Sequence, residues 1–149
     1  MDKIRILVVD DCAISRKGIE ILLSPYEKLE VTGEAEDGLQ ALDLIRRTAF
    51  DVILMDVNMP DLDGIETTKK MIQIDEKLKI LSNSSHMGVQ YIRDMIKAGA
   101  SGYITKGDDA EDYREALWTV VNGGVYLSEE ISSETYNKVF VDLKISKKW

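Results

Sequence analysis

Five polar side chains with complementary chemistry each follow a short apolar run of the sequence. They are the adjacent acids Asp10 and Asp11, then Asp56, Ser84 and Lys106. If these side chains meet, three carboxylates repel one another unless a cation neutralises them or some take up protons. A divalent metal would neutralise them, and a hydroxyl and an amine beside it suit metal-assisted phosphoryl chemistry.

The all-oxygen character of these acids indicates which metal would bind. A small number of carboxylate ligands favours Mg²⁺, with Mn²⁺ as an alternative, because such a site keeps several waters and leaves room for a phosphate oxygen. The loop after the first apolar run is acidic and has no glycine cradle, so it does not suit the phosphate of a nucleotide or a flavin. The pattern therefore favours a metal and a phosphoryl group over a bound nucleotide.

Each of these residues, taken singly, also has an ordinary structural explanation. Asp10 or Asp11 could cap a helix, and Asp56 could be a turn acid. Ser84 could likewise be a cap, and Lys106 a solvated charge. The functional interpretation depends on their coincidence at the ends of four of the five predicted strands.

Short β-branched runs alternate with longer helical patterns, which predicts the elements that position these residues. Strands buried on both faces are nearly continuous apolar runs, whereas helices show apolar residues three and four positions apart. We expect strands at residues 4–9, 31–35, 51–56, 79–83 and 101–105. Helical patterns follow them at residues 14–23, 39–45, 65–74, 89–98 and 109–121.

Five such strand and helix units predict an α/β protein with a flavodoxin-like, doubly wound sheet. We expect five parallel strands in the order 2-1-3-4-5, with five helices covering both faces and a C-terminal tail. The ligand site of such a sheet lies beyond the carboxyl ends of its strands, at the switch point between strands 1 and 3. The five polar residues all fall at that edge.

The composition limits the classes of protein to which the chain can belong. Its 149 residues, 44% of them hydrophobic, suit one compact domain. A net charge of −8 is a poor electrostatic footprint for nucleic acid, so we expect no direct nucleic-acid binding by this segment. No apolar run approaches the roughly 20 residues of a membrane helix, so we expect no membrane insertion.

The single cysteine, Cys12, directly follows the acidic pair. One cysteine excludes an internal disulfide framework and a multi-cysteine zinc site, and it fits a reducing compartment. We therefore expect a cytoplasmic protein, in which Cys12 packs at the start of the first helix.

The polar residues and their neighbours resemble the receiver domain of two-component response regulators. The resemblance covers about residues 3–125, and the set of matching positions is far more specific than any one of them. It rests on Asp10-Asp11, the stretch Asp56-Val57-Asn58-Met59-Pro60, the pair Asp63-Gly64, Ser84 and Lys106.

Two further runs, at residues 98–106 and 123–128, are most similar to the NarL/LuxR subfamily, whose members usually carry a C-terminal helix-turn-helix. His86, two places after Ser84, also fits that subfamily. Two positions depart from the common receiver pattern, with Gly107 in place of proline and Ser84 in place of threonine. The first is usual in the NarL/LuxR branch and the second keeps the hydroxyl, so both are compatible with activity.

The resemblance implies a phosphoacceptor and a metal site. Asp56 would accept a phosphoryl group from the phosphohistidine of a sensor histidine kinase, since an ionised carboxylate needs no base. Asp10 or Asp11 would bind Mg²⁺ together with Asp56, and the backbone carbonyl of Asn58 would be a further ligand. Of the first two acids, Asp11 is the preferred direct ligand.

The resemblance also implies a switch. Lys106 and Ser84 would bind phosphoryl oxygens, and the movement of Ser84 would make room for Tyr103, the aromatic switch residue. Tyr103 could alternatively be an ordinary core aromatic of the fifth strand. The remodelled surface would comprise the fourth helix, the fifth strand and the fifth helix (residues 89–121), the expected contact for a homodimer partner or an effector domain.

The C-terminal tail differs in composition from the rest of the chain. Residues 137–149 contain four lysines and one aspartate, a net charge of +3, so the preceding residues carry −11. We assign residues 1–125 to the receiver domain and 126–149 to a linker or an appended helix, too short for a complete helix-turn-helix. Either the chain is a stand-alone receiver, or a DNA-binding effector domain that regulates transcription lies beyond it.

Two other classes of function compete with the phosphorylation switch. A phosphatase of the haloacid dehalogenase type would have its nucleophile on the first strand and an acid two residues later, whereas Asp56 is on the third strand and is followed by Asn58. A module that works by protein contact alone would have lost an acid or the lysine. We interpret His86 as a loop residue rather than a phosphohistidine, and we expect catalysis only of the chain's own phosphorylation and dephosphorylation.

Overall fold

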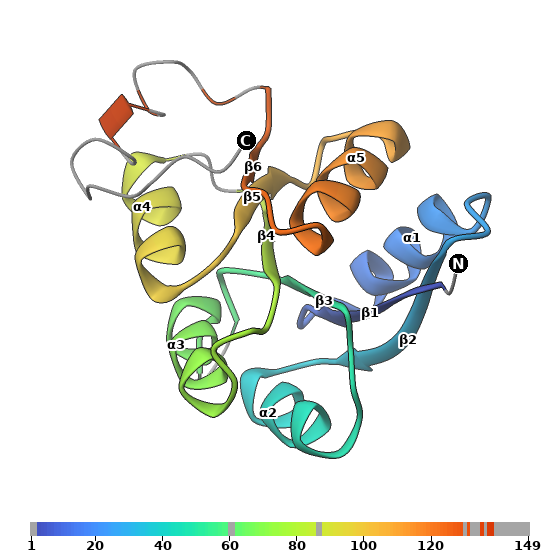
Figure 1. The fold of residues 1–149 in the computed structure, drawn as a ribbon, viewed down its shortest axis with the longest axis horizontal. Helices are drawn as coiled ribbons and strands as arrows, with labels where there is room; N and C mark the ends of the chain where they lie inside the picture. Colours follow the sequence, from blue (N-terminus) through green and yellow to red (C-terminus); the bar gives the residue numbers. More distant parts are fainter. Residues whose placement is uncertain are drawn as a thin grey trace.

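The computed structural model describes residues 3–59, 62–85, 88–129, 131, 135 and 137–138. Its strands form one parallel sheet in the order β2-β1-β3-β4-β5-β6 (Figure 1). The strands are β1 (Ile4–Val9), β2 (Leu29–Ala35), β3 (Val52–Met55), β4 (Ile80–Ser84), β5 (Gly102–Thr105) and β6 (Tyr126–Leu127).

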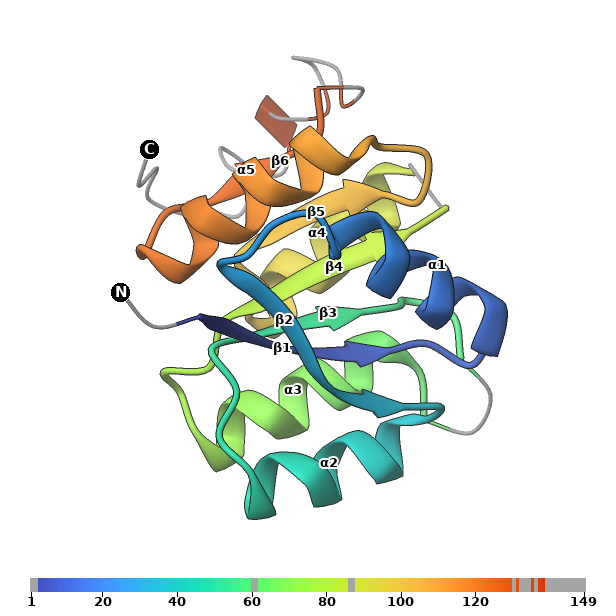
Figure 2. The ribbon, with the colours of Figure 1, turned by 90° about the vertical axis from the view of Figure 1, so that its right-hand side faces the viewer.

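The helices lie in two layers, one on each face of this sheet. In Figures 1 and 2, α2 (Gly38–Arg47), α3 (Gly64–Ile74) and α4 (Val89–Ala98) cover one face, while α1 (Ala13–Leu23) and α5 (Ala110–Val121) cover the other. Each interface has its own apolar core, because strands buried on both faces present side chains to both layers. The doubly wound α/β fold and its five helices are therefore as expected.

The sheet has six strands rather than the five that we expected. The backbone N–H of Tyr126 donates to the carbonyl of Ser101 at 3.1 Å, and that of Ser128 donates to the carbonyl of Tyr103 at 3.0 Å, so the chain pairs with β5 after α5. A Cβ at Gly102 would collide with the carbonyl oxygen of Tyr126, so only glycine permits this approach. A two-residue strand made by distant pairing has no periodicity of its own, which is why the sequence did not predict it.

The register of the central strands places the ends of β1 and β3 side by side. Val9 at the end of β1 is opposite Met55 at the end of β3. The backbone N–H of Asp56 then donates to the carbonyl of Val9 at 2.9 Å, which extends the pairing by one residue. The residues that follow these two strands are consequently neighbours at one edge of the sheet.

Among the described residues, no helix combines the length and the apolar character needed to cross a bilayer.

The structure describes only part of the C-terminal tail. Residues 135 and 137–138 are helical, and most of the remainder of the expected tail lies outside the described residues. The assignment of residues 126–149 to a linker or an appended helix thus stays a prediction.

Candidate functional site

The carboxyl ends of β1, β3 and β5 place one cation between two buried carboxylates. The Nζ of Lys106 lies 2.8 Å from Oδ2 of Asp10 and 3.5 Å from Oδ2 of Asp56. The side chains of the two acids are 2% and 8% exposed, and that of Lys106 is 29% exposed. The structure therefore brings Asp10, Asp56 and Lys106 together as the sequence predicted, and the lysine stays partly open to solvent.

The burial of Asp56 determines its acid strength. Removal from water raises the pKa of its carboxyl, and the nearby charge of Asp10 acts in the same direction. The charge of Lys106 and a hydrogen bond from the backbone N–H of Asn58 oppose this rise without cancelling it. A further cation placed beside Asp56 would therefore stabilise the charged form of its carboxyl group.

Lys106 is held at the site by its backbone as well as by its ammonium. Burial by itself would lower the pKa of Lys106, but the hydrogen bond to Asp10 and the charges of Asp56 and Asp10 together raise it. Its backbone N–H donates to the carbonyl of Ser84 at 3.1 Å, which joins the ends of β5 and β4. The lysine is therefore a positive charge that the fold keeps next to both acids.

The chain that leaves Asp56 returns close to it at the start of α3. The N–H of Gly64 donates to the carbonyl of Val57 at 2.8 Å, and a Cβ at Gly64 would collide with the backbone carbonyl of Asp56. The side chain of Asp63 caps α3 by accepting from the N–H of Glu66 at 2.8 Å. The pair Asp63-Gly64 thus packs the start of α3 against the backbone of Asp56 and Val57, and the next residue, Asn58, is exposed.

The three acids form a cluster that could hold a metal ion. Asp10, Asp11 and Asp56 each offer one carboxylate oxygen, and these oxygens lie within 4.8 Å of one another. Asp10 and Asp56 are buried, whereas Asp11 is exposed. Lys106 is the cation paired with two of these acids, so a site rich in hard oxygen donors retains excess negative charge that a divalent cation would balance.

Ser84 is the last residue of β4, and Tyr103 on the neighbouring β5 belongs to the same apolar cluster as Ile92 and Met95 of α4. Both side chains are fully buried, and their hydroxyl groups share a hydrogen bond. Burial raises the pKa of the Tyr103 hydroxyl. Tyr103 therefore lies in the interior in this structure, and its role as the switch residue stays a prediction.

The structure contradicts the prediction for the side chain of Cys12 and does not test the one for His86. Cys12 directly precedes α1, and its side chain is exposed rather than packed as we expected. Cys12 contacts the site through its backbone, because its N–H donates a hydrogen bond to Oδ1 of Asp10 at 2.9 Å. His86 lies outside the described residues.

Two residues that the sequence did not single out also contact the site. Ser15 donates from Oγ to Oδ2 of Asp10 at 2.7 Å, and Arg16 donates to the backbone carbonyl of Asp10 at 2.6 Å. Both are in the first turns of α1. Their spacing of five and six residues from Asp10 was the available signal, but polar residues near a helix start are too common for it to be decisive.

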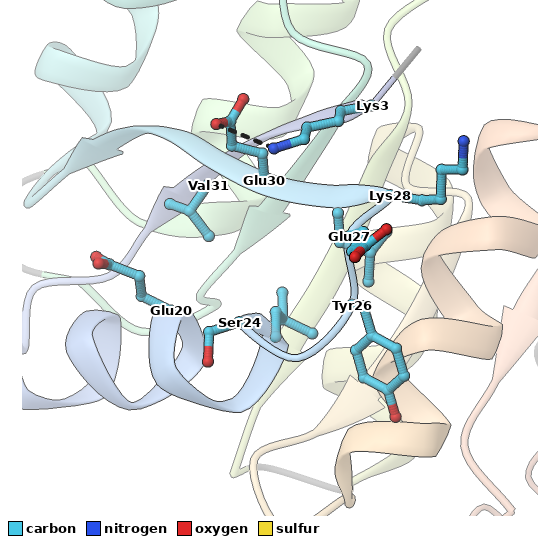
Figure 3. A pocket seen from close by; sticks show the side chains of 10 residues that line it. Lys3, Glu20, Ser24, Tyr26, Glu27, Lys28, Glu30 and Val31 are labelled. Carbon is cyan, nitrogen blue, oxygen red and sulfur yellow. Dashed lines mark ion pairs between the residues drawn. The ribbon is translucent and has the colours of Figure 1, made fainter. Parts of the chain in front are cut away.

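A separate hollow lies at the opposite edge of the sheet, near the amino ends of β1 and β2 (Figure 3). Its volume is about 720 Å³, and its lining includes Glu20, Ser24 and Tyr26. Lys3 and Glu30, which also line it, form an ion pair at 3.9 Å. None of the residues expected at the functional site lines this hollow, so it is not part of that site.

Comparison with known proteins identifies the family. The sequence pattern of the response regulator receiver domain matches residues 6–118. The transcriptional regulatory protein DegU of Brevibacillus brevis is 37% identical over 131 residues, which are 88% of this chain and 56% of that protein. The response regulator GacA of Pseudomonas aeruginosa is 36% identical over 137 residues, which are 92% of this chain and 64% of that protein. The chain thus spans roughly three fifths of the length of these relatives.

Solved structures lead to the same family. A LuxR-family two-component response regulator from Aurantimonas sp. SI85-9A1 superposes with a TM-score of 0.82 at 30% identity, covering 97% of this chain and 100% of that one. The signal receiver domain of the putative response regulator NarL from Mycobacterium tuberculosis superposes with a TM-score of 0.78 at 29% identity, covering 83% of this chain and 99% of that one. The chain therefore belongs to the response regulator receiver family of two-component systems, and it is most similar to the NarL/LuxR branch.

Proposed function

We propose that this receiver is a phosphorylation-dependent switch in which Asp56 accepts a phosphoryl group from the phosphohistidine of a sensor histidine kinase. The observation that carries this proposal is the buried Asp56 carboxylate, which lies 3.5 Å from the ammonium of Lys106 and within a cluster of three acids. An oxygen of Asp56 forms the new bond to phosphorus while the bond from phosphorus to the histidine nitrogen breaks, and that nitrogen keeps the electron pair.

The residues of the acid cluster suit Mg²⁺, with Mn²⁺ as the alternative. Asp11 and Asp56 would be direct ligands, with the backbone carbonyl of Asn58 as a third and Asp10 as a supporting acid. When bound, the metal offsets negative charge on the phosphoryl oxygens. The exposure of Asp11 supports its role, because a ligand that faces solvent can reach an entering hydrated ion.

Lys106 and Ser84 would bind the phosphoryl oxygens that the metal does not. The ammonium of Lys106 already faces Asp56, so a phosphoryl group on Asp56 would be within its reach. Ser84 is the last residue of β4, joined to Lys106 through its backbone carbonyl, and its hydroxyl has one proton that it can donate to a phosphoryl oxygen. Both residues are therefore groups that could detect phosphorylation.

Tyr103 would carry the signal from the site to the surface made by α4, β5 and α5. Its ring belongs to the same apolar cluster as Ile92 and Met95 of α4. A change in the hydrogen bond between Ser84 and Tyr103 would therefore alter packing beneath α4. This surface is the proposed contact for a homodimer partner or an effector domain, and the control of transcription through a DNA-binding domain outside this chain is part of the same proposal.

Two alternatives have different consequences. A stand-alone receiver would act through protein contacts at the same surface, without an effector domain. A magnesium-dependent phosphatase would turn over small phosphomonoesters, but the acid that this reaction needs two residues after the nucleophile is replaced by Asn58. We propose that the chain catalyses only its own phosphorylation and dephosphorylation.

Intact mass spectrometry tests the proposed phosphoacceptor. Acetyl phosphate with Mg²⁺ should add one phosphoryl group, about 80 Da, to the wild-type chain, with a covalent bond at Asp56. Asp56→Asn or chelation of the metal should prevent the addition. Labelling of the Asp56→Asn protein to the wild-type extent would show that the nucleophile is a different residue, and rapid turnover of a phosphomonoester would favour the phosphatase.

A further inference from the structure

Asp10 is the most firmly held of the three acids. Its Oδ1 accepts a hydrogen bond from the backbone N–H of Cys12 at 2.9 Å. Its Oδ2 accepts from the hydroxyl of Ser15 at 2.7 Å and pairs with the ammonium of Lys106 at 2.8 Å. Three donors of different kinds therefore converge on one buried carboxylate.

These contacts leave Asp10 few acceptor positions for a metal ion. A carboxylate oxygen offers about two lone-pair positions, so Oδ2 is fully used by Ser15 and Lys106. One position remains on Oδ1, beside the hydrogen bond from Cys12. A cation at the cluster thus finds fewer unoccupied acceptor positions on Asp10 than on Asp11 and Asp56.

The backbone of Asp10 is fixed from both sides. Its N–H donates to the carbonyl of Ala35 at 3.0 Å, and its carbonyl accepts from the guanidinium of Arg16 at 2.6 Å. Arg16 also donates from Nε to Glu34 near the end of β2 at 3.1 Å, and its side chain is only 15% exposed. Arg16 therefore ties the loop that carries the acidic pair to the neighbouring strand.

We propose that Ser15 and Arg16 are positioning residues that fix Asp10 against Lys106 and so preorganise the cation site. This inference rests on the proposed Mg²⁺ site. Ser15 determines where the carboxylate of Asp10 points, and Arg16 determines where its backbone lies. Asp11 and Asp56 would then be the residues that ligate the cation, and Asp10 would support it while keeping its hydrogen bonds to Cys12, Ser15 and Lys106.

Residues that orient the ligands of a metal site change the affinity of the site when they are removed. The typical loss for such an outer partner is about 10-fold to 100-fold. We expect the lower end for Ser15→Ala, because Cys12 and Lys106 still hold Asp10. Ser15→Thr keeps the hydroxyl and should restore affinity to within about 2-fold of the wild type.

The experiment is a titration of the metal-free 149-residue chain with MgCl₂. The amide chemical shifts of Asp10, Asp11 and Asp56 report the binding of Mg²⁺. Ser15→Ala should bind Mg²⁺ about 10-fold more weakly than the wild type. Ser24→Ala is the matched control, since Ser24 is at the far end of α1 and its hydroxyl donates to the carbonyl of Ile21. That control should bind Mg²⁺ as the wild type does.

A second measurement separates positioning from folding. Ser15→Ala should melt in EDTA within about 2 °C of the wild type, and its labelling by acetyl phosphate should recover at saturating MgCl₂. Equal Mg²⁺ affinities of Ser15→Ala and the wild type would overturn the role of Ser15. A lower melting temperature in EDTA with unchanged Mg²⁺ affinity would make Ser15 a structural residue only.

Arg16→Lys provides an independent test, because it keeps the positive charge but loses the fork that spans the Asp10 carbonyl and Glu34. It should also weaken Mg²⁺ binding several-fold, and wild-type affinity would overturn the role of Arg16. A wild-type chain that binds no Mg²⁺ would contradict the proposed function itself. A wild type that loses Mg²⁺ binding on Asp11→Asn, beside an unaffected Ser15→Ala, would contradict only the present inference.

Discussion

Lys106 is closer to Asp10 than to the proposed phosphoacceptor. Its Nζ is 2.8 Å from Oδ2 of Asp10 but 3.5 Å from Oδ2 of Asp56. In this arrangement the lysine neutralises the supporting acid first and leaves Asp56 less completely paired. A phosphoryl group on Asp56 would add negative charge on that side, so we expect it to draw the lysine away from Asp10.

Lys106→Ala should lower the stability of the chain and also remove its response to phosphorylation. Without the ammonium, two buried carboxylates lose their common cation, and we expect the chain in EDTA to lose about 2 kcal/mol of unfolding free energy. Mg²⁺ should recover more stability in this variant than in the wild type. Thermal melts with and without MgCl₂ measure both effects.

The control for this variant is Lys69→Ala, which removes an exposed lysine 3.9 Å from Glu66 on α3. Its effect should stay within about 0.5 kcal/mol. Phosphorylated Lys106→Ala should also fail to change the surface of α4, β5 and α5. A normal change at that surface, measured by partner binding or dimerisation, would show that Lys106 plays no part in the response.

The raised pKa of Asp56 predicts an unusual pH dependence of stability. A carboxyl whose pKa is raised by burial stabilises the folded state below its unfolded pKa, and this contribution is lost as the pH rises through the folded pKa. In EDTA at pH 7 we therefore expect Asp56→Asn to be more stable than the wild type, with a Tm about 2–4 °C higher. The difference should vanish below pH 3.8, the ordinary pKa of an aspartate.

Asp51 provides the opposite control. Its side chain accepts hydrogen bonds from Arg5, which lower the pKa of its carboxyl. A lowered pKa stabilises the folded state above the unfolded pKa, and the contribution is lost as the pH falls. Asp51→Asn should therefore be less stable than the wild type at pH 7. The same sign of change for both variants would contradict the explanation from burial.

Tyr103→Phe tests the hydrogen bond between Tyr103 and Ser84. The ring stays in the core while the hydroxyl is lost, so we expect a loss of about 1 kcal/mol in unfolding free energy. Acetyl phosphate should still label the variant with one phosphoryl group. Amide exchange with beryllofluoride, a phosphoryl mimic, should then show a smaller change over residues 89–121 than in the wild type. An unchanged exchange response would assign Tyr103 to the core alone.

Gly64→Ala should disrupt the site by displacing the backbone of Asp56. The added Cβ would collide with the backbone carbonyl of Asp56, so the loop and the start of α3 must shift apart. We expect a loss of at least about 2 kcal/mol in stability and slower labelling by acetyl phosphate. Denaturant unfolding and the rate of mass addition measure the two effects.

Gly18→Ala is the matched control for this substitution. A Cβ at Gly18 would meet no atom within 4 Å, and the residue lies within α1. Alanine is favoured over glycine in a helix, so this variant should gain about 0.5–1 kcal/mol and label normally. Equal effects of the two substitutions would show that the turn after Asp56 tolerates a side chain.

The apolar pattern of the sequence was enough to predict five strands and the edge of the sheet at which the polar residues gather. Buried strands and amphipathic helices have different apolar periods, so β1 was predicted at 4–9, as the structure has it, and β3 at 51–56, one residue longer at each end than observed. Since parallel strands all end at the same edge, the residues after them had to converge. The convergence of Asp10, Asp56 and Lys106 follows from that rule alone.

The pairing of groups at that edge and the last strand of the sheet depend on how the elements pack against one another, and the sequence pattern did not reveal them. The preference of Lys106 for Asp10 and the contact of Ser15 with the same carboxylate depend on the exact placement of α1 and β5. The strand β6 exists because Gly102 lets Tyr126 approach, and Tyr103 is buried because α4 covers it. These are contacts between segments distant in sequence, and their geometry is set by packing rather than by any local period.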